Sequence, residues 1–287
     1  MSSRALPDTA ASTAPTPGRA HAARELLGAC PLPAGEARAL LCQVLGLRRE
    51  RLIAHPQTPV SAEQARRFAR AVQRRSQGEP MAYLLGGQEF YGHYFEVTPE
   101  VLIPRPDTEL LVDTALRELQ ACAGARVLDL GTGSGCIAIA LALARPDCFV
   151  VASDISPGAL AVARRNARRL QAPVHLLAGH WLQPIGARFD LIVANPPYIA
   201  ANDGHLGALA HEPRAALTDE ADGLSQLRLL VAQAPAHLAP GGRLLLEHGY
   251  DQGAAVRGLM QQGGLAAQTL RDLAGRERAC LALAAAR

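Results

Sequence analysis

The chain has 287 residues, of which 49% are hydrophobic and 19% are charged, and its formal net charge is +3. This length is sufficient for one large domain and a smaller one, each with its own hydrophobic core. The small net charge argues against a protein that binds nucleic acid over a wide surface. Every one of the 29 basic residues is arginine, which excludes chemistry that needs a lysine Schiff base.

The termini and the cysteines narrow the class further. Residues 1–18 are rich in Ser, Ala, Thr and Pro without an apolar segment, which predicts a disordered tail rather than a secretory signal, with a transit peptide as the alternative. No apolar run approaches the roughly 18 residues of a membrane span. No C-x-x-C pair and no histidine at metal-ligand spacing accompanies the cysteines, so we expect reduced thiols, a cytoplasmic protein and no metal. The cysteines are Cys30, Cys42, Cys122, Cys136, Cys148 and Cys280.

Residues 19–78 are predicted to form a small all-α domain. The expected helices are His21–Ala29, Ala34–Leu45 and Ser61–Gln77. Ser61 and Gln64 have the spacing of a capping box, and Gly78 is expected just beyond the end of the last helix. Five arginines occupy much of that helix, and we interpret them as a solvated face, with a surface for an acidic or RNA-bearing partner as the alternative. They are Arg66, Arg67, Arg70, Arg74 and Arg75.

Residues 79–105 are rich in aromatic and β-branched side chains and in turn residues, which predicts a β-hairpin linker. From residue 106 to residue 287, short apolar runs alternate with helical patterns. This alternation is typical of an α/β domain with a doubly wound, mostly parallel sheet, which we expect to carry an antiparallel C-terminal strand. The predicted strands are 126–130, 149–153, 174–177, 191–194, 242–247, 266–272 and 279–284, and the predicted helices are 107–119, 136–144, 157–170, 224–237 and 253–262.

A glycine-rich segment from Val127 to Gly135 joins the first of these strands to its helix. Glycines at such a turn let the backbone approach a ligand closely, and the start of the helix supplies free N–H groups. A dinucleotide motif would need a third glycine at Cys136, so that class of cofactor is disfavoured. Asp129 is instead expected to receive an amino group, such as the one that S-adenosyl-L-methionine (SAM) carries.

Two more polar segments follow later strands. Asp154 is placed to bind two ribose hydroxyls, or to cap the helix that begins at Pro157. The sequence Asn-Pro-Pro-Tyr at 195–198 follows the buried run 189–194. Its prolines lack an N–H and fix φ at about −65°, so the turn presents carbonyl oxygens and the Asn195 side chain. A rigid acceptor site of this kind suits an NH2 group that is held while its nitrogen attacks.

The loop, the acid and the Asn-Pro-Pro-Tyr turn are expected at one edge of the sheet, because parallel strands end there together. This order resembles Class I SAM-dependent methyltransferases that methylate amino groups. The resemblance implies SAM as the cofactor and a set of residues that contact it. That set is Asp129, Gly131, Thr132, Gly133, Ser134, Gly135, Asp154, Trp181 and Asn195.

Further segments are similar to the bacterial release-factor glutamine methyltransferase family, PrmC or HemK. The most specific is Leu102-Ile-Pro-Arg-Pro-Asp-Thr-Glu109, because the related ribosomal-protein glutamine methyltransferases differ after the arginine. The similarity covers roughly residues 20 to 285 and departs at His180, where the family usually carries Asp or Asn. The other similar segments are 78–80, 88–92, 210–217, 222–224 and 246–249.

The resemblance implies methyl transfer from SAM to the side-chain amide nitrogen, N5, of the glutamine in the Gly-Gly-Gln motif of class 1 peptide chain release factors. It implies that Asn195 and Pro196 accept hydrogen bonds from that NH2 group, that Tyr198 packs on the flat amide, and that Pro197 belongs to the same substrate site. Residues 19–78 and the region of Arg105 would hold the release factor. We expect a monomer that requires neither a membrane nor direct contact with nucleic acid.

Three other functions stay open at this point. An adenine-N6 methyltransferase of nucleic acid uses the same acceptors on a flipped base, but it needs a strongly basic groove or a target-recognition domain. A ribosomal-protein glutamine methyltransferase is a second alternative. A catalytically silent SAM-binding scaffold is a third, against which the intact loop, acid and acceptor turn argue.

Overall fold

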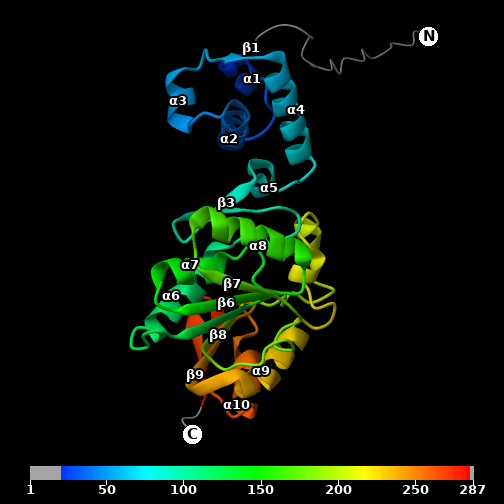
Figure 1. Cartoon of the computed structure of the whole chain (residues 1–287). Coiled ribbons are helices and arrows are strands. Elements are labelled where there is room, and N and C mark those ends of the chain that lie inside the picture. Colours follow the sequence, from blue (N-terminus) through cyan, green and yellow to red (C-terminus); the bar gives the residue numbers. More distant parts are fainter. Residues whose placement is uncertain (1–20, 285–287) are drawn as a thin grey trace, which may run out of the picture. The chain divides into compact units, whose positions relative to one another are not determined.

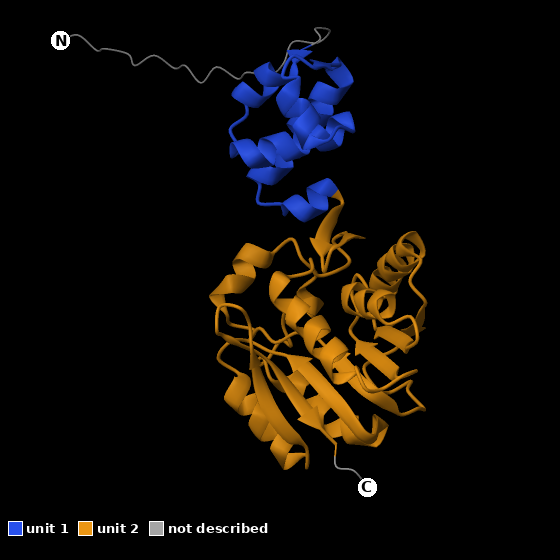
Figure 2. Cartoon of the chain, turned by 90° about the vertical axis from the view of Figure 1, so that its left-hand side faces the viewer, with its two compact units in different colours: residues 1–85 blue, residues 86–287 orange. Residues whose placement is uncertain are grey.

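The computed structural model describes residues 21–284, so the predicted tail at 1–18 lies outside the described residues. Contacts between residues divide the chain into two compact units, residues 1–85 and 86–287 (Figure 2). Each unit has its own buried core. The two units are therefore described separately.

The first unit is mostly helical. Its helices are α1 (Ala23–Gly28), α2 (Ala34–Leu45), α3 (Arg49–Ala54), α4 (Ala62–Ser76) and α5 (Met81–Leu85). The predicted helix at 21–29 is wrong at its start, because β1 (His21–Ala22) pairs with β2 (Pro59–Val60) in an antiparallel bridge. Helix α3 was not predicted, and α5 lies where we predicted β structure. Both are too short for their sequence period to be recognised.

Helix α4 confirms the predicted capping box. The Ser61 hydroxyl accepts a hydrogen bond from the Gln64 backbone, and the Gln64 side chain accepts one from the Ser61 backbone. Gly78 follows the helix with φ of 94°. The arginines of this helix are mostly paired with acids of the same unit. Arg66 and Arg70 contact Glu63, Arg74 contacts Glu79, and Arg75 contacts Glu36.

The second unit begins with the predicted hairpin, which is shorter than expected. Strand β3 (Gly87–Phe90) pairs with β4 (His93–Glu96), and residues 97–105 continue without a strand. Phe90 and Phe95 are buried and pack edge to face, with ring centroids 6.1 Å apart. Asn166 joins β4 to the glycine-rich loop, because its side chain accepts from Glu96 N–H and donates to the Glu96 and Ser134 carbonyls.

A seven-stranded sheet forms the centre of the second unit (Figure 1). The strand order is β10-β11-β9-β8-β5-β6-β7, and β11 runs antiparallel to both of its neighbours. This arrangement confirms the predicted doubly wound, mostly parallel sheet with an antiparallel C-terminal strand. The strands are β5 (Arg126–Leu130), β6 (Phe149–Asp154), β7 (Val174–Ala178), β8 (Phe189–Ala194), β9 (Leu238–Glu247), β10 (Ala266–Arg271) and β11 (Glu277–Leu283).

Helices cover both faces of this sheet because its strands are apolar on both sides. Val127, Leu191 and Val193 face one core, which also contains residues of the helices between the hairpin and β7. Leu128 and Ile192 face the other core, which contains residues of the two C-terminal helices. The first group is α6 (Glu109–Glu118), α7 (Cys136–Ala144) and α8 (Pro157–Leu170), and the second is α9 (Ser225–His237) and α10 (Gly253–Gln262).

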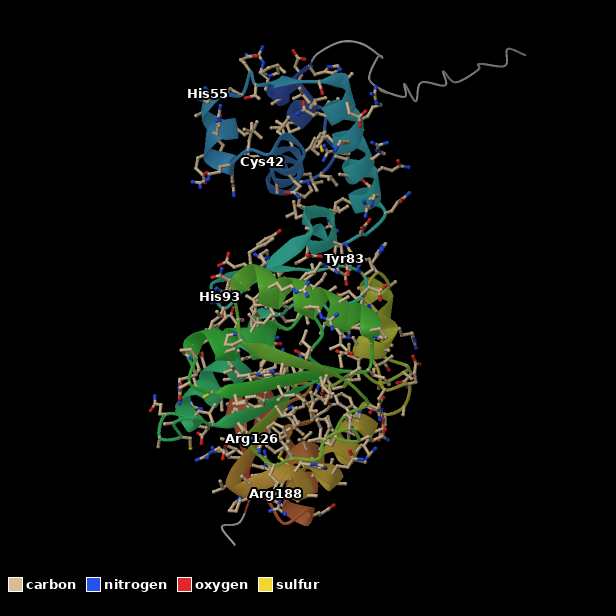
Figure 3. All side chains as sticks on the ribbon, viewed as in Figure 1. Cys42, His55, Tyr83, His93, Arg126 and Arg188 are labelled. Atoms are coloured by element: carbon tan, nitrogen blue, oxygen red, sulfur yellow. The ribbon has the colours of Figure 1, made fainter. Side chains whose placement is uncertain are left out.

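The parallel strands begin at one end of the sheet and finish at the opposite end. Arg126 and Arg188, labelled in Figure 3, lie where β5 and β8 begin. At the opposite edge, the chain between β8 and α9 contains two short 3-10 helices that were not predicted, Gly204–Leu209 and Arg214–Ala216. A third 3-10 turn, η1 (Pro106–Thr108), begins the helix that we predicted at 107–119. Within residues 21–284, no helix is long and apolar enough to cross a membrane.

Candidate active site

The carboxyl ends of four neighbouring strands are aligned in register. Leu130 pairs with Ser153 on one side and with Ala194 on the other, and Ala194 pairs with Leu246. The residues that come next along each strand therefore emerge at one edge of the sheet. These residues are Gly131, Asp154, Asn195 and Glu247.

A cavity of about 670 Å³ opens at this edge of the second unit. Eight of the residues predicted from the sequence line it: Gly131, Thr132, Gly133, Ser134, Asp154, Trp181, Asn195 and Pro197. Four others do not: Asp129, Gly135, Pro196 and Tyr198. The structure thus brings most of the predicted cofactor residues together around one space, and it places part of the Asn-Pro-Pro-Tyr turn behind the wall.

The glycine-rich loop forms one wall of the cavity through a backbone that needs glycine. Gly131 and Gly133 have φ of 67° and 55°, which is the left-handed region that other residues rarely adopt. A Cβ atom on Gly131 would lie 3.1 Å from the Trp181 ring. The loop is joined to the next strand because Thr132 N–H donates to the Ser153 carbonyl at 2.9 Å. This wall is therefore packed closely against Trp181 and held to strand β6.

Asp129 lies beneath this loop rather than in the cavity. Its Oδ2 accepts hydrogen bonds from the Thr132 hydroxyl at 2.6 Å and from Ala138 N–H at 3.2 Å. Burial raises the pKa of Asp129 to about 7, although these hydrogen bonds act in the opposite direction. Its other oxygen, Oδ1, is buried and has no hydrogen-bond partner among the described residues. An unsatisfied buried acceptor of this kind is suited to an ammonium group.

Asp154 ends strand β6 and faces the cavity. Its Oδ2 accepts from Gly133 N–H at 2.9 Å, and its Oδ1 accepts from Ser156 N–H at 2.8 Å. A carboxylate has about four lone-pair sites, so two acceptor positions remain for ligand hydroxyls. The alternative of a helix cap at Asp154 is wrong, because Ser156 is the N-cap of α8 and accepts from Ala159 N–H.

Trp181 lines the cavity, with its ring next to Gly131 of the glycine-rich loop. It has φ of 50°, an unusual value for a large residue, and its indole N–H donates to the Gln226 side chain at 2.8 Å. His180 lies beside it and also lines the cavity. Sequence reasoning identified Trp181 but not Gln226, because the partner comes from helix α9 and only the fold brings it close.

The Asn195 carboxamide has a defined orientation. Its Nδ2 donates a hydrogen bond to the Thr108 hydroxyl oxygen at 3.2 Å, and Thr108 is buried. Both residues line the cavity. Among residues 21–284, no donor is hydrogen-bonded to Asn195 Oδ1. Because the nitrogen is held on the protein side, the oxygen is the atom left to accept a hydrogen bond from a ligand.

Tyr198 is turned away from the cavity. Its hydroxyl donates to Glu247 Oε1 at 3.3 Å, and its ring packs against the core on the α9 and α10 side of the sheet. Burial and the Glu247 carboxylate raise the pKa of Tyr198 well above its usual value. Tyr198 does not line the cavity, so the predicted packing of its ring on the substrate amide stays a prediction.

Gln252 fixes the end of the Asn-Pro-Pro-Tyr turn. Its side-chain nitrogen donates to the carbonyls of Tyr198 and Gly223, at 3.0 and 3.2 Å. Its side-chain oxygen accepts from Gly249 N–H at 2.8 Å. A Cβ atom on Gly223 would lie 2.4 Å from the Tyr198 carbonyl oxygen, so glycine is required for this approach. Three loops are thereby joined at one point.

An ion pair borders the part of the cavity nearest the loop after β8. The Arg105 guanidinium contacts the Glu212 carboxylate, which is buried and also accepts from Ile103 N–H at 3.0 Å. Arg105 itself lines the cavity, together with Arg214 and Glu220. Arg214 and Glu220 form a second pair, which is exposed. This side of the space therefore carries polar groups of both charges.

Comparisons with known proteins bear on what this cavity does. Residues 19–86 match the family model described as the PrmC N-terminal domain, and residues 106–261 match that of the methyltransferase small domain. A release factor glutamine methyltransferase of Bordetella pertussis is 54% identical over 260 residues, which cover 89% of this chain and 96% of that protein. One from Burkholderia pseudomallei is 50% identical over 279 residues, which cover 93% and 97%.

This chain belongs to the release factor glutamine methyltransferase family. It is accordingly an enzyme, a methyltransferase, and the family resemblance predicted from its motifs is confirmed. A solved methyltransferase from Pyrococcus furiosus supports the fold alone, with a TM-score of 0.52 and 18% identity over 77% of this chain and 99% of that one.

Sequence reasoning did not identify Thr108 and Glu247, two residues that contact the Asn-Pro-Pro-Tyr turn. Thr108 lies in the segment 102–109, and Glu247 lies in the segment 246–249, both of which carry the resemblance. The motifs signalled that these positions matter to the family. They did not signal that Thr108 meets Asn195 or that Glu247 meets Tyr198, because these pairs lie 87 and 49 residues apart in the sequence and only the fold brings them together.

Proposed function

We propose that this chain transfers the methyl group of SAM to the side-chain amide nitrogen, N5, of the glutamine in the Gly-Gly-Gln motif of class 1 peptide chain release factors. The observation that carries the proposal is the orientation of the Asn195 carboxamide, which is held by Thr108 at 3.2 Å beside the glycine-rich loop. The Bordetella and Burkholderia relatives, which are named release factor glutamine methyltransferases, support the transfer of a methyl group to a glutamine of a release factor.

The residues around the cavity fit SAM. The free acceptor positions of Asp154 suit two ribose hydroxyls. The acceptor that we propose for the amino group is the unpartnered Oδ1 of Asp129, a residue that lies beneath the glycine-rich loop and does not line the cavity in this structure. Residues 131–134 and Trp181 line the same space. When bound, SAM supplies an electrophilic methyl group on a positively charged sulfur.

The Asn-Pro-Pro-Tyr turn orients the substrate amide. An amide nitrogen is a weak nucleophile, because its lone pair is delocalised into the carbonyl group. A hydrogen bond from its NH2 group to Asn195 Oδ1 holds the nitrogen in place and stabilises the positive charge that grows on it. The second acceptor that the family resemblance implies is the Pro196 carbonyl, although Pro196 does not line the cavity in this structure. The two prolines keep the turn rigid and offer no competing N–H donor.

No general base is needed in this scheme. The methylated amide is cationic and strongly acidic, so it releases its extra proton readily to water. This agrees with the environment of Asn195, whose direct polar neighbour is the neutral hydroxyl of Thr108. Orientation of the amide nitrogen therefore carries most of the rate enhancement.

We further propose the following organisation. Residues 19–78 bind the release factor, residues 79–105 form the hairpin linker, and residues 106–287 carry catalysis. The enzyme works as a monomer in the cytoplasm, where its substrate acts in translation, and it needs no direct contact with nucleic acid. The pairing of Arg66, Arg74 and Arg75 with acids supports a solvated α4 surface over a nucleic-acid site.

One experiment tests the proposed function. Purified protein is incubated with SAM and an unmodified class 1 release factor, and the Gly-Gly-Gln peptide is analysed by mass spectrometry. We expect one added methyl group on the glutamine. DNA and ribosomal RNA, offered in parallel with labelled SAM, test the adenine-N6 alternative, and ribosomal proteins test the ribosomal-protein alternative.

A further inference from the structure

A buried carboxylate lies directly behind the acceptor turn. Glu247 is the last residue of β9 and is 2% exposed. Its Oε1 accepts a hydrogen bond from the Tyr198 hydroxyl at 3.3 Å. Its Oε2 is buried and has no hydrogen-bond partner among the described residues. Glu247 does not line the cavity, so the proposed mechanism gives it no direct contact with the cofactor or the substrate.

The hydroxyl of Thr108 lies close enough to the same carboxylate to affect its pKa. Burial raises the pKa of Glu247 to about 7, and the Thr108 and Tyr198 hydroxyls act in the opposite direction. Burying a carboxyl group lowers the stability of a protein unless the group is hydrogen-bonded. The structure therefore places one acidic side chain beside both hydroxyl groups that adjoin the Asn-Pro-Pro-Tyr turn.

The orientation of Asn195 depends on how Thr108 uses its hydroxyl. A threonine hydroxyl carries a single hydrogen and accepts through its lone pairs. Because Thr108 Oγ1 accepts from Asn195 Nδ2, its own hydrogen must point to another acceptor. Glu247 Oε2, which is buried and has no hydrogen-bond partner among the described residues, is the acceptor that this polar cluster leaves for it. With the hydrogen held there, Oγ1 presents only lone pairs to Asn195, and the carboxamide must turn its NH2 group inward.

The position of Thr108 is itself anchored. Its neighbour Asp107 forms an ion pair at 3.0 Å with Arg278 of β11, and Arg278 also contacts Asp272 at 3.2 Å. The Arg278 side chain is only 14% exposed. Residues from η1, β9, β11 and the turn after β8 thus form one polar cluster behind the cavity wall.

We propose that Glu247 is a positioning residue that fixes the Asn195 carboxamide oxygen toward the substrate amide, acting through the hydroxyl groups of Thr108 and Tyr198. This inference rests on the proposed function, because that function requires the Asn195 oxygen to face a substrate NH2 group. Glu247 directs the Thr108 hydroxyl and Thr108 directs Asn195. Tyr198 ties the far end of the turn to the same carboxylate.

Three substitutions test this chain of contacts. Glu247→Gln introduces an NH2 group that can donate to Thr108 and reverse its hydroxyl. Thr108→Val removes the hydroxyl and keeps the shape, whereas Thr108→Ser keeps the hydroxyl. Two matched controls lie elsewhere in the second unit: Glu118→Gln breaks an ion pair with Arg243, and Thr114→Val removes a buried hydroxyl from α6.

The readouts are kcat for release-factor methylation, the SAM dissociation constant and the free energy of unfolding. Misplacing a reacting group by about 1 Å can cost roughly 100-fold in rate, so we expect Glu247→Gln and Thr108→Val each to lower kcat by about that factor. SAM binding should stay unchanged. Thr108→Ser should retain kcat, and the double variant should lose no more than either single one, because both act through one contact.

Several outcomes would overturn the inference. They are a wild-type kcat in Glu247→Gln, additive losses in the double variant, and a Thr108→Ser rate as low as that of Thr108→Val. A loss of stability equal to that of Glu118→Gln with no change in kcat would show a merely structural role.

A crystal structure of the Glu247→Gln variant tests the same inference without an activity assay. We expect the Asn195 nitrogen to leave Thr108, and an unchanged contact would contradict the inference whether or not the enzyme acts on release factors. A wild-type protein that leaves the Gly-Gly-Gln glutamine unmodified would contradict the proposed function instead. The two failures are therefore distinguishable.

Discussion

The Asn195 side-chain nitrogen lies 3.2 Å from the Thr108 hydroxyl oxygen, although 87 residues separate the two in the sequence. In this contact the nitrogen faces Thr108, so the oxygen is the end of the carboxamide that is left for a ligand. An asparagine that presents its oxygen can hold an NH2 group, and one that presents its nitrogen cannot. The chemistry proposed for the Asn-Pro-Pro-Tyr turn therefore depends on a residue outside that motif.

The first prediction concerns Asn195→Ala. Loss of an oriented hydrogen-bonding group at a reacting centre typically costs about 10²–10³ in kcat, and we expect a loss at least that large. SAM binding, measured by calorimetry, should change little. Asn202→Ala is the matched control, because Asn202 is exposed in the following loop. Loss of SAM binding together with activity would show that Asn195 serves the cofactor more than the acceptor.

The second prediction concerns Gly131→Ala, with Gly124→Ala as its control. Both glycines have φ of 67°, but a Cβ atom on Gly131 meets Trp181 whereas one on Gly124 meets nothing within 4 Å. The left-handed backbone should cost each variant roughly 1–2 kcal/mol of stability. Only Gly131→Ala should weaken SAM binding. Trp181 is the chain's single tryptophan, so its fluorescence reports binding directly. Equal SAM affinities in the two variants would contradict the close fit of this wall.

The third prediction separates two roles of Asp129. If Oδ1 receives the amino group of the cofactor, Asp129→Asn should weaken binding of S-adenosylhomocysteine and leave 5′-methylthioadenosine, which lacks that group, unaffected. If Asp129 only holds the loop through Thr132 and Ala138, both ligands should lose affinity equally. Asp147→Asn is the control, because Asp147 pairs with Arg145 away from the cavity. Calorimetry with both ligands decides between the roles.

The fourth prediction concerns the pH dependence of stability. Burial raises the pKa of Glu247 to about 7 from its usual 4.5, against the influence of Thr108, Tyr198 and Arg278, while Asp107 adds to the rise. The folded chain therefore binds a proton at this site more tightly than the unfolded chain does. The free energy of unfolding should fall as pH rises from about 4.5 to about 7, and the loss is complete above that range.

Glu247→Gln removes this titration. We expect the variant to gain stability relative to the wild type between pH 5 and pH 8, measured by urea unfolding at both values. Glu118→Gln, which breaks the pair with Arg243, should show no such gain. A difference between Glu247→Gln and wild type that stays constant with pH would contradict the raised pKa.

Much of the fold could be predicted because the signals are local and periodic. Helices 136–144, 157–170 and 253–262 begin and end at the predicted residues, and strand 126–130 does as well. The short helices Arg49–Ala54 and Met81–Leu85 could not be predicted in this way. Each has too few residues for a helical period to stand out from its surroundings.

The same distinction between local and long-range signals applies to the residues of the site. The glycine-rich loop, Asp154 and Asn195 could be predicted because each directly follows an apolar strand. The roles of Thr108 and Glu247 could not, since a polar residue at the end of a strand has many partners until the strands are paired. Tyr198 shows the difference most clearly. Its place in the turn was predicted, yet the direction of its hydroxyl is set by Glu247, 49 residues away.

The central claim is tested most directly by mass spectrometry of a class 1 release factor after incubation with this protein and SAM. The account predicts one methyl group on the glutamine of the Gly-Gly-Gln motif, absent when Asn195→Ala replaces the wild type. An unmodified glutamine alongside methylated DNA, RNA or ribosomal protein would contradict it.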